Sequence, residues 1–288
     1  MGGLLASRLA EDGENVVSLA VRRPTPALTF QVAGRKDDVA APRVLLVEQV
    51  EALEQVDWVV VATKAHDSAH LGPWLTHPSC TTANVAVAQN GIEHAARLRH
   101  LVAPERVVPL IVTYGAERPV AGRIVQTLAG TVHVPDDELG RCFAALASHT
   151  SLDVEVAPDF ALALWTKLAW NLTGNSLSTL TNLPVREVAL RPELRDLALR
   201  LLAEVRVVAA AHAVQLERCI ENDILDTFGS YPETVRSSMW QDRQAGRTLE
   251  HDAISGAVVR HAALVGVDAP YSRTVTSLLE TLSETISR

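Results

Sequence analysis

The sequence predicts an α/β domain over residues 1–157 followed by an all-helical domain over residues 158–288. In the first half, β-branched runs typical of buried strands alternate with segments of helix length, a pattern that favours βαβ units and a parallel sheet. After Pro158-Asp159, a helix-starting dipeptide, the apolar residues follow helical spacing to the end of the chain. A length of 288 residues suits two domains.

The elements of the first half follow from short apolar runs and their flanking residues. Residues 2–12 have the leucine spacing of a helix that stops at Gly13. Strands are expected at 16–21, 56–62, 85–88 and 107–112. The runs 124–128 and 131–134, joined through Ala129-Gly130, are predicted to form an antiparallel hairpin that closes the domain.

The second half is predicted to be helical throughout. Proline and glycine residues divide it into helices near 159–182, 191–213, 216–228, 231–265 and 270–286.

Composition narrows the class of protein. Hydrophobic residues make up 48% and charged residues 21% of the chain, which is ordinary for a globular protein. The net charge of −8 with scattered basic residues argues against a nucleic-acid partner. Three cysteines without a C-x-x-C pair favour a reducing cytoplasm, and no apolar run reaches the ~18 residues of a membrane span. The oligomeric state stays open, with a homodimer as one option.

A polar stripe crosses the first helix of the second half. The segment W-T-K-L-A-W-N-L-T-G-N places Lys167, Asn171 and Asn175 four residues apart. On a helix each step of four overshoots one turn by about 40°, so these side chains form a narrow stripe roughly 12 Å long. Apolar neighbours would bury most of that helix, and polar groups there cost free energy unless something polar meets them.

A second polar stretch, S-S-M-W-Q-D-R-Q-A-G-R-T-L-E, offers Ser237, Ser238 and Glu250. Together with the stripe it supplies a cation, a carboxylate, two amides and hydroxyls. That combination suits recognition and protonation of a small, oxygen-rich acid.

The N-terminal residues have the order of a dinucleotide-binding fold, but the first elements are missing. Such a fold begins with a strand and a G-x-G-x-x-G turn before the first helix. Here Gly2 can serve as the last glycine of that turn, while no strand or G-x-G precedes it. We interpret the chain as starting from an internal methionine of a longer reading frame, with a genuinely strandless variant as the alternative. Arg22 stands where an NAD-binding protein would have Asp or Glu, which favours NADPH.

Several motifs together resemble the ketopantoate reductase (2-dehydropantoate 2-reductase) family over nearly all of the chain. They are G-G-L-L-A near the start, T-K-A-H-D at 63–67, Q-N-G at 89–91, W-x-K-L-x-x-N-x-x-x-N at 165–175, and S-S-M-x-Q-D-x-x-x-G-R-x-x-E-x-D-x-x-x-G at 237–256. The resemblance implies a Rossmann-like NADP-binding domain before the helical domain. It also implies reduction of 2-dehydropantoate to pantoate with NADPH, for coenzyme A synthesis, in a cleft between the two domains.

The resemblance further implies roles for residues of the catalytic and substrate site. Lys167 would be the general acid, and Glu250 would lie near the reacting centre and the cofactor's ribose. Asn171, Asn175 and Ser238 would hold the substrate, with Ser238 preferred over Ser237 for its carboxylate.

The remaining roles concern the cofactor. Asn90 would lie between the nicotinamide ribose and the substrate. Lys64 and Arg22 would reach a 2′-phosphate, and Arg23 could substitute for Arg22. Gly2 and the backbone of Ala116 would also contact the cofactor.

Alternatives remain for these assignments. The lysine could extend from its helix to solvent, the asparagines could join two helices, a serine could cap a helix, and Asn-Gly is an ordinary turn signal. His66 and His70 resemble a two-histidine metal motif without a third ligand, so no metal is expected.

Two alternatives concern the function itself. Val185 and Val235 stand where some family members present an asparagine to the substrate. This departure points to another 2-oxo acid as substrate. A catalytically silent binding or regulatory homologue that lacks the phosphate loop is the second alternative.

Overall fold

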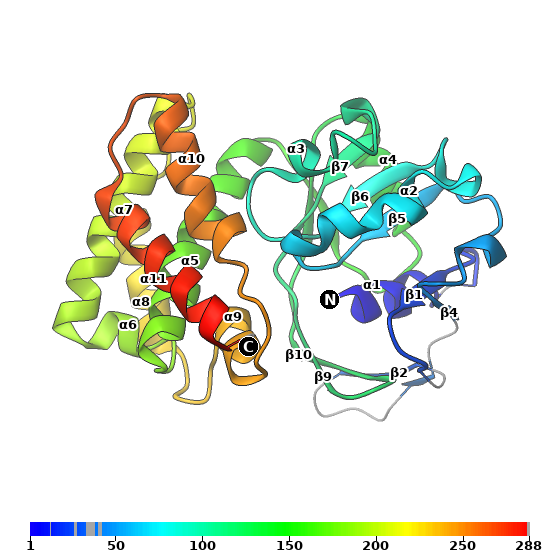
Figure 1. The fold of residues 1–288 in the computed structure, drawn as a ribbon, viewed down its shortest axis with the longest axis horizontal. Helices are drawn as coiled ribbons and strands as arrows, with labels where there is room; N and C mark the ends of the chain where they lie inside the picture. The colour runs from blue at the N-terminus through cyan, green and yellow to red at the C-terminus, as the bar shows by residue number, and fades with distance from the viewer. Residues whose placement is uncertain (12, 26–27, 33–37, 40–41, 287–288) are drawn as a thin grey trace. The chain divides into compact units, whose positions relative to one another are not determined.

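The computed structural model describes residues 1–11, 13–25, 28–32, 38–39 and 42–286, which form two compact units (Figure 1). Unit 1 contains Met1–Gln89 and His94–Phe160, and unit 2 contains Asn90–Glu93 and Ala161–Arg288. The short segment Asn90–Glu93 therefore belongs with the helices of unit 2, although the chain on both sides of it belongs to unit 1. The α/β fold followed by a helical region agrees with the sequence prediction.

Unit 1 is built around a parallel sheet of three strands in the order β5-β6-β7. These strands are β5 (Trp58–Val61), β6 (Asn84–Val87) and β7 (Val107–Pro109). They form because valines dominate each run, and buried β-branched side chains pack well on a sheet that is covered on both faces. The helices α2 (Gly72–Leu75) and α3 (His94–Leu98) lie in the connections between them.

A second parallel pair forms at the start of the chain. The helix α1 (Gly2–Leu9) precedes β1 (Ser18–Val21), which pairs with β4 (Arg43–Leu46). Leu4 and Leu5 of α1 are almost fully buried in the unit's core. Within the described ranges, the β1-β4 pair and the β5-β6-β7 sheet are separate sheets. The predicted helix and the predicted strand at 16–21 are both confirmed, each slightly shorter than expected.

The predicted hairpin between 124–128 and 131–134 is wrong. The strand β10 (Arg123–Leu128) pairs antiparallel with β9 (Gly115–Val120) and parallel with β2 (Thr29–Val32), beside which lies β3 (Asp38–Val39). The actual hairpin turns at Gly122, whose φ of 81° suits glycine. The strand β9 escaped prediction because it is polar and contains Pro119, a residue that sheets accept at an edge such as this one.

The other half of the predicted hairpin lies in a different sheet. The strand β11 (Val132–Pro135) pairs antiparallel with β8 (Ile111–Val112) and parallel with β12 (Val154–Ala157). The expected strand 107–112 is therefore two strands, β7 and β8, in two sheets. The helix α4 (Glu138–Leu146) connects β11 to β12, with Asp137 capping its N-terminus.

Helices are the only regular secondary structure among the described residues of unit 2. Its elements are α5 (Phe160–Thr181), α6 (Glu187–Leu190), α7 (Pro192–Ala211), α8 (Ile220–Ser230), α9 (Ser238–Gln244), a π-helical turn (Asp252–Gly256), α10 (Ala257–Leu264) and α11 (Pro270–Ile286). A continuous apolar core joins α5, α7, α8, α10 and α11.

The single helix predicted over 231–265 is wrong. The chain instead forms α9, an irregular segment that contains Gly246, the π-helical turn and α10. Gly246 has φ 62°, a left-handed conformation that ends a helix and that favours glycine. Among the described residues, no helix is both long and apolar enough to cross a membrane.

Candidate active site

The helix α5 places the predicted polar stripe on its partly exposed face. Lys167, Asn171 and Asn175 are each partly exposed, while Leu168 and Leu172 beside them are buried in the core. The pattern arises because a period near 3.6 residues returns every fourth side chain to nearly the same direction. The three polar side chains of the stripe are therefore partly exposed beside buried leucines of the same helix.

Burial changes the acidity of Lys167. Removal from water disfavours the charged ammonium and lowers the pKa of Lys167 from 10.5 to about 8. Such a lysine is still mostly protonated at neutral pH, yet it gives up a proton far more readily than a solvent-exposed lysine. This shift is the property that a general acid needs.

Asn171 belongs to a hydrogen-bonded series of three side chains. Its Nδ2 donates to Oδ1 of Asn90 at 3.2 Å, and Asn90 Nδ2 in turn donates to Oε2 of Glu250 at 3.0 Å. Glu250 is only 4% exposed. Residues from three distant segments thus meet in unit 2, with Lys167 one turn before Asn171 on α5 and Asn175 one turn after it.

The serines of the second polar stretch have different environments. Ser237 is buried, caps α9 by accepting a hydrogen bond from the backbone nitrogen of Trp240 at 3.2 Å, and shares a 2.9 Å hydrogen bond with Ser178. Ser238 is exposed at the first position of α9. Ser237 thus has the capping role that was the alternative for these serines, and the hydroxyl of Ser238 is the one accessible to solvent.

The two valines that depart from the family pattern lie together. The backbone nitrogen of Val185 donates to the carbonyl oxygen of Val235 at 3.3 Å, and both side chains pack against the core of unit 2. Val185 is 5% exposed. Val185 is therefore enclosed in the apolar core of unit 2.

Four of the predicted cofactor residues, Gly2, Arg22, Lys64 and Ala116, lie in unit 1, whereas Asn90 and Glu250 lie in unit 2. Arg22 follows β1 and its guanidinium is hydrogen-bonded to the carboxylate of Asp67, with the arginine side chain 65% exposed. Lys64 follows β5, and its backbone carbonyl accepts a 3.4 Å hydrogen bond from the buried Gln89. Ala116 lies in β9 opposite Gln126.

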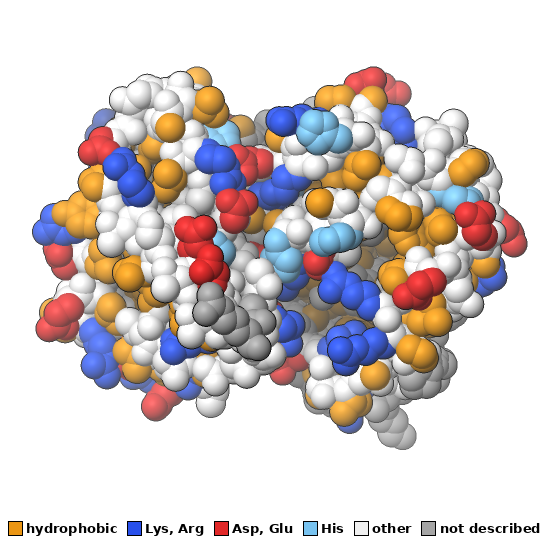
Figure 2. Space-filling model, in the orientation of Figure 1, with side chains coloured by type: hydrophobic (Ala, Val, Ile, Leu, Met, Phe, Trp, Pro, Cys, Tyr) orange, Lys and Arg blue, Asp and Glu red, His pale blue; other side chains and the backbone are white. Residues whose placement is uncertain are grey.

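Positive charge surrounds the N-terminal end of α1. Burial lowers the pKa of the Met1 amino group, and the charges of Lys64 and Arg118 lower it further. Figure 2 shows basic side chains over the part of unit 1 where Figure 1 places α1. A Cβ added to Gly2 would lie 3.3 Å from the Cβ of Ala62, so glycine permits the close approach of α1 to the end of β5. This region suits a negatively charged ligand.

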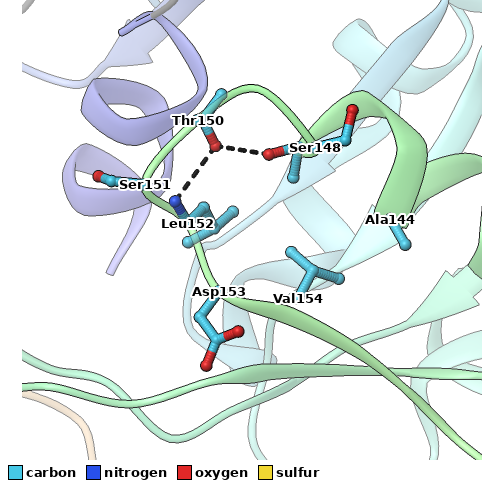
Figure 3. Close-up of a pocket in the computed structure, with 8 residues that line it drawn as sticks. Ala144, Ser148, Thr150, Ser151, Leu152, Asp153 and Val154 are labelled. Atoms are coloured by element: carbon cyan, nitrogen blue, oxygen red, sulfur yellow. Dashed lines mark hydrogen bonds between the residues drawn. The ribbon is translucent and has the colours of Figure 1, made fainter.

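A shallow depression in unit 1 contains none of these residues. It has a volume of about 370 Å³ and lies between α4 and β12 (Figure 3). The Thr150 hydroxyl donates to the Ala147 carbonyl oxygen and accepts from the Leu152 backbone nitrogen, so these lining groups bond to one another. We assign it no function.

Comparison with solved structures identifies the class of protein that this fold defines. A dimeric ketopantoate reductase from Staphylococcus aureus matches with a TM-score of 0.84 at 24% identity, over 98% of this chain and 95% of that one. A D-mandelate dehydrogenase, solved with NADH and anilino(oxo)acetate, matches with a TM-score of 0.85 at 21% identity, over 99% and 96%. These likenesses show the fold, which this chain shares with a ketopantoate reductase and a D-mandelate dehydrogenase.

Sequence comparison identifies the family. Residues 1–138 match Ketopantoate reductase PanE/ApbA, and residues 159–283 match Ketopantoate reductase PanE/ApbA C terminal. A 2-dehydropantoate 2-reductase from Caulobacter vibrioides is 33% identical over 97% of this chain and 94% of its own length. One from Mycobacterium tuberculosis is 30% identical over 86% and 83%. The chain belongs to the ketopantoate reductase family, whose members are oxidoreductases that act on a keto group.

The structure also shows charged residues that sequence reasoning missed. Arg118 lies two residues after Ala116 on the same edge strand, and its charge acts on the Met1 amino group as that of Lys64 does. Glu93 and Arg260 form an ion pair with a 2.6 Å contact beside the Asn90 segment. The sequence holds no local signal for that pair, because its members are 167 residues apart.

Proposed function

We propose that the chain reduces 2-dehydropantoate to pantoate with NADPH, as a step toward pantothenate and coenzyme A. The observation that carries this proposal is the hydrogen-bonded series Asn171–Asn90–Glu250 beside a lysine whose pKa falls to about 8. Buried or half-buried polar groups of this kind cost free energy, and a polar substrate that requires them explains their presence.

Lys167 protonates the keto oxygen of the substrate from its Nζ. Its lowered pKa brings the ammonium close to the pH at which it works, where a general acid is most effective. The nicotinamide supplies the hydride to the keto carbon when the cofactor is bound. By donating its proton, Lys167 neutralises the negative charge that develops on the keto oxygen during the reaction.

The amides and the serine orient the acid. Asn171 and Asn175 lie one and two turns beyond Lys167 on α5, so they meet a small substrate along its length. Ser238 offers its exposed hydroxyl to the substrate carboxylate. Asn90 is oriented by Glu250 and Asn171, and Glu250 accepts hydrogen bonds near the reacting centre.

The residues of unit 1 fit a phosphorylated dinucleotide. Arg22 and Lys64 are cations at strand ends, and Arg22 is held by Asp67 while most of its side chain remains exposed. The positive region at the start of α1 suits a phosphate, and Gly2 lets α1 approach the end of β5 closely. Ala116 presents backbone in β9. An arginine after β1 supports NADPH over NADH, because it can pair with a 2′-phosphate.

A second candidate substrate is a different 2-oxo acid with an apolar substituent. Val185 and Val235 support it, since both positions are apolar and both side chains pack against the core of unit 2. D-Mandelate dehydrogenase, whose fold matches, has a bound oxo acid with an anilino group.

The experiment that tests the proposal is a coupled measurement of cofactor binding and oxidation. We would assay 2-dehydropantoate and a bulkier apolar 2-oxo acid, each with NADPH and with NADH. The chain would be compared with a version that carries an added strand and G-x-G before Met1, in which Gly2 completes the turn, so that weak pyrophosphate binding is not mistaken for inactivity.

Each result has a distinct meaning. Faster NADPH oxidation with 2-dehydropantoate than with the apolar acid supports the proposal. Faster NADPH oxidation with the apolar acid would assign the chain a different substrate for the same reaction. Binding of NADPH by both versions without turnover of either acid, or no binding at all, overturns the proposal and favours a silent homologue.

A further inference from the structure

The pair Asn90–Glu250 joins two segments that each carry an acidic residue a few positions later. Glu93 follows Asn90 by three residues, and Asp252 follows Glu250 by two. Both acidic side chains are bound by one arginine, Arg260 of α10. The two segments that provide the hydrogen-bonded pair are thus held by a common group.

The contacts of Arg260 have strong geometry. Its Nε donates to Glu93 Oε1 at 3.0 Å and its Nη2 to Glu93 Oε2 at 2.6 Å, which makes a bidentate pair. Its Nη1 donates to Asp252 Oδ1 at 2.5 Å, and Nη2 also donates to the Asp252 carbonyl oxygen at 2.9 Å. A planar guanidinium that makes two parallel hydrogen bonds to a carboxylate fixes orientation as well as distance.

The contact of Arg260 with Glu93 differs from an ordinary surface ion pair. Isolated, exposed ion pairs contribute little to stability, because water competes for both charges. Here the Glu93 side chain is only 18% exposed and that of Arg260 is 41% exposed, whereas the Asp252 side chain is 69% exposed. Three hydrogen bonds from the guanidinium reach side-chain oxygens, and a fourth reaches a backbone carbonyl oxygen. Arg260 therefore binds the backbone as well as side chains.

A glycine makes room for the arginine. A Cβ added to Gly256 would lie 3.1 Å from Asp252 Oδ1 and 3.3 Å from Arg260 Nη1. Gly256 ends the π-helical turn Asp252–Gly256, a rare conformation that occurs often at functional sites. In a regular α-helix, residues eight apart such as Asp252 and Arg260 would be about 12 Å apart along the axis. The turn and the glycine together accommodate the ion pair.

We propose that Arg260 is a positioning residue: by holding Glu93 and Asp252 together, it sets Asn90 against Glu250 in the geometry that the reaction requires. Arg260 acts through these neighbours and needs no contact with substrate or cofactor. The kinetic consequence rests on the proposed function, whereas the anchoring of residues 90–93 does not. Small displacements at an active site are costly, since a shift of about 1 Å can lower the rate roughly 100-fold.

The first test is a double-mutant cycle on kcat with Arg260→Gln and Asn90→Ala. We expect Arg260→Gln alone to lower kcat by about 10- to 100-fold, with a smaller change in the substrate KM. In the Asn90→Ala background the same change should lower kcat by less than about twofold, because the residue being positioned is gone. Equal losses of kcat in both backgrounds, or an unchanged kcat, would overturn the proposal.

Matched variants separate positioning from simple stabilisation. Arg273→Gln removes an arginine from an exposed pair with Asp268 in the same unit and should leave kcat within about twofold. Glu93→Gln preserves the shape of the side chain but weakens the bidentate contact, so it should lower kcat as Arg260→Gln does. It replaces Arg260→Gln in the test if that variant folds poorly. Arg260→Lys keeps the charge without the fork, so we expect an intermediate kcat. If kcat for Arg260→Lys is as low as for Arg260→Gln, the bidentate guanidinium is required. If Arg273→Gln lowers kcat as much as Arg260→Gln does, the proposal is overturned.

A second measurement works without substrate. Backbone hydrogen exchange at residues 91–93 should rise in Arg260→Gln relative to the parent and to Arg273→Gln, because the segment loses its anchor. If the parent reduces no 2-oxo acid, the proposed function fails. Hydrogen exchange alone then shows whether Arg260 anchors residues 91–93. Unchanged exchange at 91–93 would then overturn the positioning role.

Discussion

Glu250 in the helical unit is 4% exposed and accepts a hydrogen bond from Asn90, whereas Arg22 in the α/β unit has a side chain that is 65% exposed and pairs with Asp67. In the helical unit, polar groups without partners would cost about 1–3 kcal/mol each. The Asn171–Asn90–Glu250 series is therefore constrained by folding as well as by chemistry. An exposed pair such as Arg22–Asp67 contributes only about 0–1 kcal/mol, so it can change with little effect on the fold.

This difference teaches where function and stability are coupled in the molecule. Substitutions in the helical unit's site should alter both the reaction and the free energy of unfolding. Substitutions at the cations of the α/β unit should alter cofactor selectivity alone. The predictions below test that separation.

The largest effect is expected from Lys167→Ala. If Lys167 protonates the keto oxygen as proposed, its loss should lower kcat by about 10²–10⁴-fold, the usual range for a general acid. Steady-state kinetics of the parent and the variant, with thermal unfolding to confirm the fold, provide the measurement. A kcat near the parent's would remove Lys167 from the catalytic role.

The same lysine should reduce stability at neutral pH. Its pKa is about 8 in the folded protein and 10.5 in the unfolded chain, so folding opposes its charged form. That cost is complete below pH 8, shrinks as pH rises from 8 toward 10.5, and disappears above. At pH about 7, Lys167→Met should therefore raise the free energy of unfolding, by at most about 3 kcal/mol.

Denaturant unfolding of Lys167→Met and the parent at pH about 7 and about 9.5 checks this sign. The stability difference between the two proteins should be smaller at the higher pH. A variant that is less stable than the parent at pH about 7 would show that Lys167 is held by favourable interactions that exceed its desolvation.

A smaller loss is expected from Asn171→Ala. The variant loses the donor to Asn90 Oδ1, and a hydrogen bond of this kind contributes about 1 kcal/mol, so kcat/KM should fall about 5- to 10-fold. Gln244→Ala is the matched control, since this exposed amide donates to Asn182 in the same unit. Equal losses in the two variants would indicate a general effect on the helical unit.

The sequence could predict the parts of the site that are local. Lys167, Asn171 and Asn175 share a face because helical periodicity alone sets their directions. The pairing of Asn90 with Glu250 could not be predicted in this way, because the two residues are 160 positions apart and depend on tertiary packing. The contact of Arg260 with Glu93 could not be predicted for the same reason.

The errors in the fold have similar causes. The segment 124–134 has hairpin-like runs, but strand partners are chosen by tertiary contacts, and β10 pairs with the polar strand β9. The helix predicted over 231–265 has suitable apolar spacing, yet Gly246 and the π-helical turn interrupt it. Periodicity identified helical character there, whereas backbone conformation decided where each helix ends.

The smallest effect on the fold is expected from Arg22→Ala, which tests the α/β side of the comparison. Because the arginine is exposed and its pair with Asp67 is a surface pair, the free energy of unfolding should change by less than about 0.5 kcal/mol. If Arg22 pairs with a 2′-phosphate, the KM for NADPH should rise about 5- to 10-fold, while the KM for NADH stays constant. Arg141→Ala, which breaks an exposed pair with Asp136 in the same unit, is the control and should change neither KM. A parallel rise for NADPH and NADH would place Arg22 outside the 2′-phosphate site, and Lys64 and Arg118 would then be the cations to test, since both lie near the start of α1.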